Sequence, residues 1–147
     1  MKTLICLLIG TIITLTLSAF TTGTEKTTDV NPHLKTDSTG EDPELIVQEQ
    51  LKAYNARNIE AFLATYSDQI KIYDYSGKLI IHGKDQMRIV YADYFKHTDL
   101  RCDIEERMII NNKVAYKEKV TRGSVVIYTV AIYEILDGKI HKVIFVQ

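Results

Sequence analysis

Asp74 lies near the end of the stretch "IKIYDYSG", in which apolar and polar residues alternate, and it shares the phase of Ile70 and Ile72. Such alternation predicts a strand with one face turned to the core, which would place the carboxylate on the buried side. A carboxylate in an apolar pocket can act as a general base or contact a ligand. Asp is also favoured as the first residue of a tight turn, and Gly77 suits the last positions of one. The two interpretations are compatible, because a residue can end a strand and still face a pocket.

Two further acids stand in phase with apolar neighbours. Glu106 and Glu118 alternate with the residues of their own predicted strands, namely Cys102, Ile104, Met108 and Ile110 for the first and Val114, Tyr116 and Val120 for the second. A buried carboxylate is costly unless it is paired or neutral. Such acids therefore either contact a ligand or a cation, or a bulge turns them to solvent. We expect a bulge or a position at the rim of the sheet for both.

His82 ends a short predicted strand beside Gly83, where it could act as an acid-base group at the mouth of a pocket or lie at the rim. The other histidines fit no paired-histidine zinc motif, and we predict no metal site. No glycine pattern of a dinucleotide or phosphate loop occurs in the sequence, so we expect no cofactor. Cys102 is expected to be a small buried side chain rather than a reactive thiol.

The surrounding elements follow from periodicity and turn signals. A helix begins at Asp42 and Pro43, breaks within "NARN" and restarts with Ile59, Phe62, Leu63 and Tyr66 at helical spacing. After the strand with Asp74 we expect a short returning strand at 79–82, a third helix at 84–97, and four strands at 100–110, 113–122, 125–136 and 139–147. Turn residues between these four strands predict an antiparallel meander. The order predicts an α+β fold with helices on one face of a curved sheet.

The stretch 125–136, "VVIYTVAIYEIL", is apolar on both faces, unlike a strand that is solvated on one side. It could be the buried central strand of a monomer. Because the helices suffice for only one face of the sheet, we favour a homodimer formed through the sheet.

The N-terminal 41 residues predict the cellular location of the protein. Residues 1–22 resemble a signal peptide, with a cut between 18 and 23, although the apolar run also reaches the lower limit for an uncleaved membrane anchor. Residues 23–41 are polar and predict a disordered tether before a single domain at 42–147. We therefore expect an exported protein, periplasmic or secreted, with no membrane contact after cleavage. The 18 Lys and Arg residues are balanced by 19 Asp and Glu residues, which argues against a nucleic-acid partner.

The segment "VQEQLKAYNARNIEAFLATYSDQIKIYD", the helix opening at Gly83-Lys84 and the turn at Asp137-Gly138 resemble the nuclear transport factor 2-like superfamily. Within it, they resemble the SnoaL-like and ketosteroid isomerase-like proteins. The resemblance covers residues 44–147. It implies a cone-shaped fold, in which three helices pack against a strongly curved, mainly antiparallel sheet around a mostly apolar pocket.

The resemblance also implies roles for particular residues. The catalytic base of a ketosteroid isomerase falls on Asp74, whereas its two oxyanion donors fall on Gln50 and near Ile132, so both donors are absent from those positions. Further candidate ligand contacts are Tyr54, one helical turn beyond Gln50, and Tyr116 or Tyr128, which could reach inward from the sheet.

We therefore expect a binding domain whose pocket holds a small apolar or partly polar molecule. One alternative is an isomerase, lyase or hydrolase that uses Asp74 as general base. A second alternative is a protein-interaction or structural domain that uses the outer face of the sheet.

Overall fold

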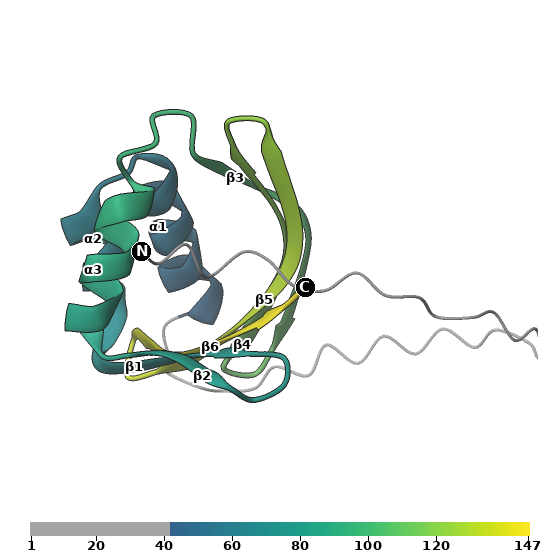
Figure 1. The fold of residues 1–147 in the computed structure, drawn as a ribbon. Helices are drawn as coiled ribbons and strands as arrows, with labels where there is room; N and C mark the ends of the chain where they lie inside the picture. The colour runs from purple at the N-terminus through teal and green to yellow at the C-terminus, as the bar shows by residue number, and fades with distance from the viewer. Residues whose placement is uncertain (1–41) are drawn as a thin grey trace, which may run out of the picture. The chain divides into compact units, whose positions relative to one another are not determined.

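The computed structural model describes residues 42–147, which form three helices and six strands (Figure 1). In chain order these are α1 (Pro43–Asn55), α2 (Ile59–Ala64), β1 (Tyr66–Asp74), β2 (Leu79–His82), α3 (Lys84–Tyr94), β3 (Arg101–Ile110), β4 (Lys113–Arg122), β5 (Val125–Leu136) and β6 (Lys139–Val146). The signal peptide and tether predicted within residues 1–41 lie outside the described residues. No helix among the described residues is long and apolar enough to cross a membrane.

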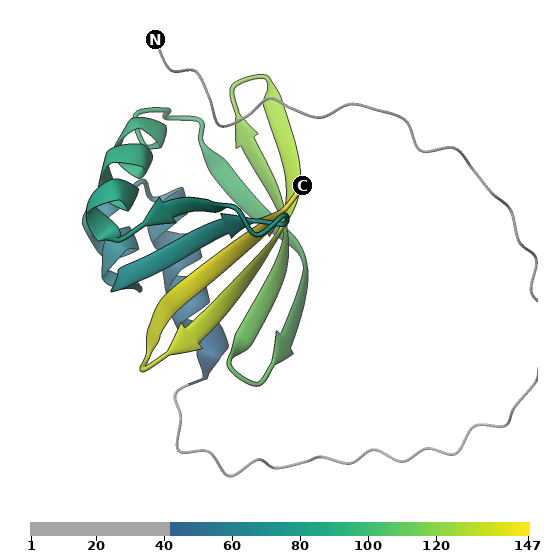
Figure 2. The same cartoon turned by 60° about the horizontal axis from the view of Figure 1, so that its bottom comes forward.

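The six strands form one sheet in the order β2-β1-β6-β5-β4-β3. β1 and β6 are parallel, and every other neighbouring pair is antiparallel, which confirms the predicted meander of β3 to β6. Irregular register interrupts the pairing at Ile72/Tyr73, Ile104/Glu106 and Glu134/Ile135. Such bulges bend a strand and increase its twist. The sheet curves around the helices, which lie on its concave side (Figures 1 and 2).

The motif "NARN" joins α1 to α2 through specific contacts. The Asn55 side chain donates to the Cys102 carbonyl oxygen at 2.9 Å and accepts from the Cys102 N–H at 2.8 Å, so it fastens the end of α1 to β3. Arg57 adopts a positive φ of 54°, which reverses the chain. Asn58 caps α2 by accepting from the Ala61 N–H at 3.1 Å. The break between α1 and α2 is therefore held by specific hydrogen bonds, which also connect the helices to β3.

Two predicted element bounds differ from the structure by two or more residues. Tyr66, assigned by its spacing to the second helix, is the first residue of β1, because α2 ends at Ala64 and Thr65 is its C-cap. The third helix ends at Tyr94 rather than His97, and turn hydrogen bonds carry the chain on to Leu100. Both errors lie at element ends, where periodicity is weakest.

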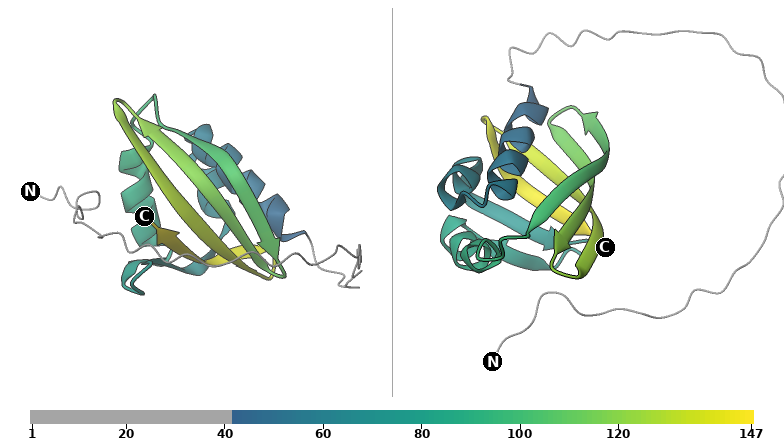
Figure 3. Two further views of the ribbon diagram at one scale, coloured as in Figure 1. Left: turned by 90° about the vertical axis from the view of Figure 1, so that its right-hand side faces the viewer. Right: turned by 90° about the horizontal axis from the view of Figure 1, so that it is seen from above.

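The core lies between the helices and the concave face of the sheet, and Figure 3 shows the helices behind the strands when the sheet faces the viewer. Its largest fully buried side chains are those of Val47, Phe62, Ile70, Ile72, Met87, Leu100, Val114, Ile140 and Val143. Because side chains alternate along a strand, the buried members fix which residues point outward.

Candidate functional site

Glu118 lies on the concave side of the sheet, where it is only 5% exposed. On β4 it shares a face with Val114 and Tyr116, which are both buried. The Tyr133 hydroxyl of the neighbouring strand donates to Glu118 Oε1 at 2.7 Å. The two side chains form an enclosed acid–phenol pair, which we call the Glu118–Tyr133 pair.

The rim or bulge position predicted for Glu118 was therefore wrong, whereas the bulge predicted at Glu106 is confirmed. The irregular register lies on β3 between Ile104 and Glu106, and it turns Glu106 outward, where its side chain is 73% exposed and binds Lys117 Nζ at 2.9 Å. Along β4 the pairing with β5 runs without interruption from Lys113 to Arg122, so Glu118 keeps the inward phase of its apolar neighbours. A bulge in one strand leaves the phase of its partner unchanged.

Burial raises the pKa of the Glu118 carboxyl to about 7, against the opposing effect of the hydrogen bond from Tyr133. Desolvation disfavours the charged form of an acid, and a hydrogen bond donated to the carboxylate favours it. Desolvation dominates here. The carboxyl group therefore changes its protonation state close to neutral pH, a property common among acid-base and ligand-binding groups.

Gln50 and Tyr54 of α1 are both buried on the side of the helix that faces the interior. Gln50 forms a hydrogen bond with the Tyr66 side chain. The Tyr54 ring packs against Phe62 and Phe95 at centroid distances of 5.9 and 5.5 Å. The interior is thus rich in aromatic rings with polar ends, and the ligand-binding roles predicted for Gln50 and Tyr54 stay predictions.

Tyr116 is also buried on the concave side, next to Tyr133, with the two rings 6.1 Å apart. Its hydroxyl donates to Glu44 Oε1 at 3.2 Å, and Arg107 donates to the same oxygen at 2.9 Å. Burial, followed by the charge of Glu44, raises the pKa of Tyr116 to about 12. The phenol is held at the start of α1, so its polar end serves a contact within the protein.

Asp74 ends β1 and organises the following turn. Its Oδ1 atom accepts hydrogen bonds from the Ser76 N–H at 2.9 Å and the Lys78 N–H at 3.0 Å, and the Ser76 hydroxyl donates to the same atom. The Ser76 side chain, followed by these backbone donors, lowers the pKa of Asp74. This geometry favours the turn interpretation of Asp74, and a catalytic role for it stays a prediction.

The other sequence-predicted contacts lie away from the interior. Tyr128 is 55% exposed and pairs with Lys119 on the convex face, so the inward orientation expected for Tyr128 was wrong. Ile132 lies on the same face, in register with Ala115 and Ile144. His82 is exposed at the end of β2, in agreement with a rim position. No group of three or more His, Cys, Asp and Glu side chains within residues 42–147 is arranged to hold a metal ion.

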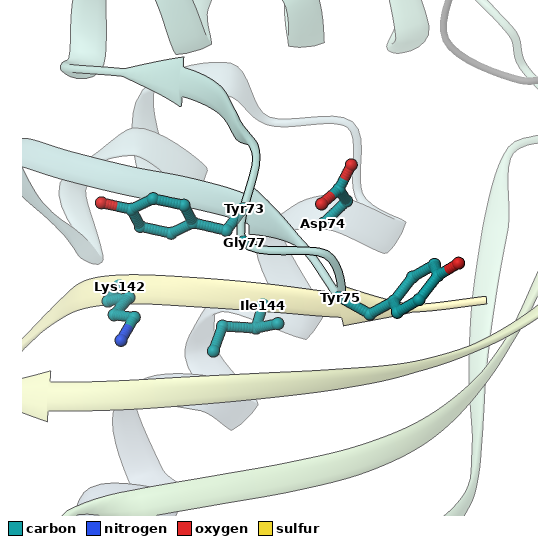
Figure 4. A pocket seen from close by; sticks show the side chains of 6 residues that line it. All are labelled: Tyr73, Asp74, Tyr75, Gly77, Lys142 and Ile144. Carbon is teal, nitrogen blue, oxygen red and sulfur yellow. The ribbon is translucent and has the colours of Figure 1, made fainter.

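A shallow hollow of about 210 Å³ lies where β1 and β6 meet, lined by Tyr73, Asp74, Tyr75, Gly77, Lys142 and Ile144 (Figure 4). Lys142 Nζ lies 5.8 Å from the centroid of the Tyr73 ring and 3.9 Å from Glu134 Oε2. In Figure 4 the Asp74 carboxylate points away from Lys142 and Ile144. The hollow is therefore lined by the rings of Tyr73 and Tyr75 and by Lys142, which is already paired with Glu134.

The Glu118–Tyr133 pair is the feature that reasoning from the sequence missed. One signal was available, because Glu118 shares the phase of Val114 and Tyr116, and Tyr133 shares that of Ala131 and Ile135. Pairing the two required the register of β4 with β5, in which Val114 lies opposite Tyr133 and Glu118 opposite Thr129.

The curved sheet and the helices on its concave side define an α+β fold of the nuclear transport factor 2-like class. A family model described as "SnoaL-like domain" matches residues 47–143, and the chain belongs to this family. This confirms the resemblance that the sequence motifs indicated. No curated protein matches the chain.

Solved structures share the fold. An uncharacterized cystatin fold protein from Novosphingobium aromaticivorans superposes with a TM-score of 0.68 at 22% identity, over 74% of this chain and 100% of that one. A putative ketosteroid isomerase from Kribbella flavida has a TM-score of 0.63 at 15% identity, over 71% and 76% of the two chains. A putative polyketide cyclase from Sinorhizobium meliloti has a TM-score of 0.59 at 16% identity, over 68% and 92%. At these identities the similarity shows the fold alone.

Proposed function

We propose that this protein is an exported SnoaL-like domain that binds a small, largely apolar molecule between its helices and the concave face of its sheet. The observation that carries the proposal is the Glu118–Tyr133 pair, a carboxyl and a phenol enclosed among aromatic side chains. Ligand sites are typically apolar with a few convergent polar groups. The family match and the structural neighbours titled as a putative ketosteroid isomerase and a putative polyketide cyclase support the same class of ligand.

Export is the part of the proposal that rests on the sequence alone. The charged start and the apolar run within residues 1–22 support it. Determination of the N-terminus of the protein recovered from its native host tests it. A mature chain that begins after residues 18–23 supports cleavage and export, whereas a chain that still begins at Met1 in the cytoplasmic fraction contradicts them.

A ligand titration of the purified protein tests the binding site. The probe is 2-ethylnaphthalene, an uncharged molecule without a hydrogen-bonding group, and the readout is the NMR signals of individual tyrosine rings. We expect the signals of the buried Tyr54 and Tyr133 to shift while that of the exposed Tyr128 stays unchanged. Shifts confined to Tyr128, or no shift at any ring, would contradict an interior site.

An acid-base enzyme is the second candidate, and the pKa of Glu118 near 7 is the observation that favours it. Glu118 then replaces Asp74 as the better placed acid-base group, because Ser76 and Lys78 already occupy the Asp74 carboxylate. A screen of proton exchange next to the carbonyl group of small ketones, run with the protein and with Glu118→Gln, tests this candidate. Equal exchange rates with both proteins would exclude it.

We further propose that two copies of the chain pair through the convex face. An apolar row crosses five strands there, in register from β3 to β1: Met108, Ala115, Ile132, Ile144 and Tyr73. Val126, Tyr128 and Val146 extend this surface, and each is exposed. A contiguous exposed apolar surface of this kind is typical of an interaction site. Sedimentation at equilibrium tests the proposal, and a mass equal to that of one chain would contradict it.

A further inference from the structure

β3 forms one edge of the sheet (Figure 3), and contacts from α1 cover only part of this edge. At the end of α1, the Asn55 side chain bonds both the N–H and the C=O of Cys102. At the start of α1, Glu44 binds the Arg107 side chain at 2.9 Å. α1 therefore lies along β3 from Cys102 to Arg107, and the strand continues beyond these contacts to Ile110.

The uncovered end of β3, residues 107–110, is apolar after its first residue, and we call it the open edge. Met108, Ile109 and Ile110 are all exposed, by 43% to 60%. In natural proteins, charges, bulges or a covering element keep an edge strand from pairing with another chain. The acids and the bulge of β3 lie earlier, at 103–106. The open edge therefore lacks these devices and can accept an added strand.

The register with β4 fixes which backbone groups of the open edge point outward. Ile110 and Lys113 flank the two-residue turn between β3 and β4, so their backbone groups bond to each other. Bonded and non-bonded pairs alternate along antiparallel strands. Met108 therefore also bonds toward β4, whereas Arg107 and Ile109 turn their N–H and C=O groups away. No residue within 42–147 bonds these outward groups.

We propose that the open edge pairs with the same edge of a second copy, as antiparallel strands related by a two-fold axis at Met108. In this register Arg107 of each copy exchanges two hydrogen bonds with Ile109 of the other, so the two pairs form four bonds and satisfy every outward group. A register centred on Arg107 would place two guanidinium groups opposite each other. A register centred on Ile109 would leave only one bonded pair within the strands.

The charges and the apolar residues around the open edge favour a second copy as the partner. Glu106 faces Ile110 of the second copy, and Lys113 lies one strand further, about 10 Å away and within reach of the two side chains. No like charges face each other across the new pair. Met108 also ends the apolar row that crosses the convex face to Tyr73, so the pairing joins the rows of two copies.

The contact is separate from the pairing proposed through the convex face, because it uses the backbone at the edge of the sheet. Two short strands bury less than the about 1,200 Å² of total surface that is typical of stable complexes. The edge pair therefore forms reversibly and stays largely dissociated in dilute solution. A covalent trap is the measurement suited to such a contact.

Disulfide trapping tests the register directly. Met108 faces its own counterpart in a non-hydrogen-bonded pair, where Cα atoms lie about 4.5 Å apart, a distance that a disulfide bridges. Met108→Cys in the full chain should therefore form a disulfide-linked dimer under mild oxidation. The chain also carries Cys6→Ser, and the remaining Cys102 is buried.

Ile110→Cys is the matched control, because it is similarly exposed on the same strand. In the proposed register the two copies of residue 110 are offset by four residues, about 13 Å along the strand. Ile110→Cys should therefore cross-link about tenfold more slowly than Met108→Cys, since its thiols meet only by random collision. A mixture of Glu106→Cys and Ile110→Cys chains should form the mixed dimer, because these positions face each other.

Ile109→Pro tests the backbone bonds. Proline removes an N–H that points away from β4, so the circular dichroism of the fold should persist while the Met108→Cys cross-link slows about tenfold. Tyr128→Lys separates the two interfaces, because it alters the convex face and leaves the edge intact. The Met108→Cys cross-link should form in this variant as in the unmodified surface.

Three results would overturn the inference. The first is a Met108→Cys cross-link no faster than that of Ile110→Cys, which would leave the open edge to a strand of a different protein. The second is the absence of a mixed dimer of Glu106→Cys and Ile110→Cys, which stays decisive even if Ile109→Pro does not fold. The third is loss of the Met108→Cys cross-link in Tyr128→Lys, which would assign the contact to the convex face.

Discussion

Replacement of Glu118 by Gln should change how the stability of the protein depends on pH. The pKa of this carboxyl is raised from 4.5 to about 7 in the folded protein, so the folded state holds a proton that the unfolded chain releases. The stability that comes with protonation is fully present below the unfolded pKa and is lost as the pH rises through the folded pKa. Above that point the fold contains a desolvated carboxylate.

The size of the effect follows from the difference between the two pKa values. A shift of one pKa unit corresponds to about 1.4 kcal/mol, so a rise from 4.5 to about 7 corresponds to about 3 kcal/mol at high pH. Between about pH 5 and about pH 8 this group should lower the free energy of unfolding by about 2 to 3 kcal/mol. The Glu118→Gln variant should lack this change, because glutamine has no charge in either state.

Glutamine retains the acceptor for the Tyr133 hydroxyl but brings an N–H₂ group that needs partners. We expect burial of this group to lower the free energy of unfolding of the variant by about 1 kcal/mol. The variant should therefore be slightly less stable than the unmodified protein at about pH 5 and more stable by about 2 kcal/mol at about pH 8. The crossing of the two stability curves is the signature of a buried acid.

Urea unfolding of the purified proteins, followed by circular dichroism at the two pH values, measures these differences. Glu106→Gln is the matched control, because water solvates that carboxylate and the substitution removes no desolvated charge. The reasoning would be refuted if the stability difference between Glu118→Gln and the unmodified protein were the same at both pH values.

Three other substitutions test separate parts of the structure. Asn55→Ala removes both hydrogen bonds to the Cys102 backbone and should lower the free energy of unfolding by about 2 kcal/mol, measured by urea unfolding, and an unchanged midpoint would contradict the role of this contact. If two copies pair through the convex face as proposed, Tyr128→Lys should reduce the sedimenting mass from two chains to one, whereas Ile89→Lys, a change at a residue that is 75% exposed on α3, should not. The lowered pKa of Asp74 stabilises the fold above the unfolded pKa, and this contribution is lost as the pH falls through the folded pKa. Asp74→Asn should therefore flatten the acid side of the melting-temperature profile, and an unchanged acid side would contradict the turn contacts.

The order of helices and strands could be predicted from the sequence because each element carries its own period and its own turn residues. Asp137 and Gly138 illustrate this: both have positive φ, 51° and 67°, as a tight hairpin turn requires, and the pair was recognisable as a turn from residue type. Tyr66 shows the limit, since an apolar residue at the end of a short helix fits the first position of the next strand equally well.

The orientation of individual strand residues could be predicted less well. Glu106 and Glu118 have the same local pattern, yet a bulge in β3 turns the first outward while the regular pairing of β4 keeps the second inside. On β5 the apolar residues of both faces leave the phase undetermined, so Tyr128 and Tyr133 could not be told apart. In each case the missing information was the register with a neighbouring strand, which depends on residues distant in the sequence.

The acid at position 118 is not explained by the needs of the fold. The Tyr133 hydroxyl requires an acceptor on β4, and the amide oxygen of a glutamine would supply one without the cost of a desolvated charge. That cost, about 3 kcal/mol above neutral pH, is a large fraction of the 5–15 kcal/mol by which domains are typically stable. A carboxyl differs from an amide here in one chemical respect, because it can gain and lose a proton near neutral pH. This difference is the reason for the proposal that Glu118 uses its proton in binding or in reaction.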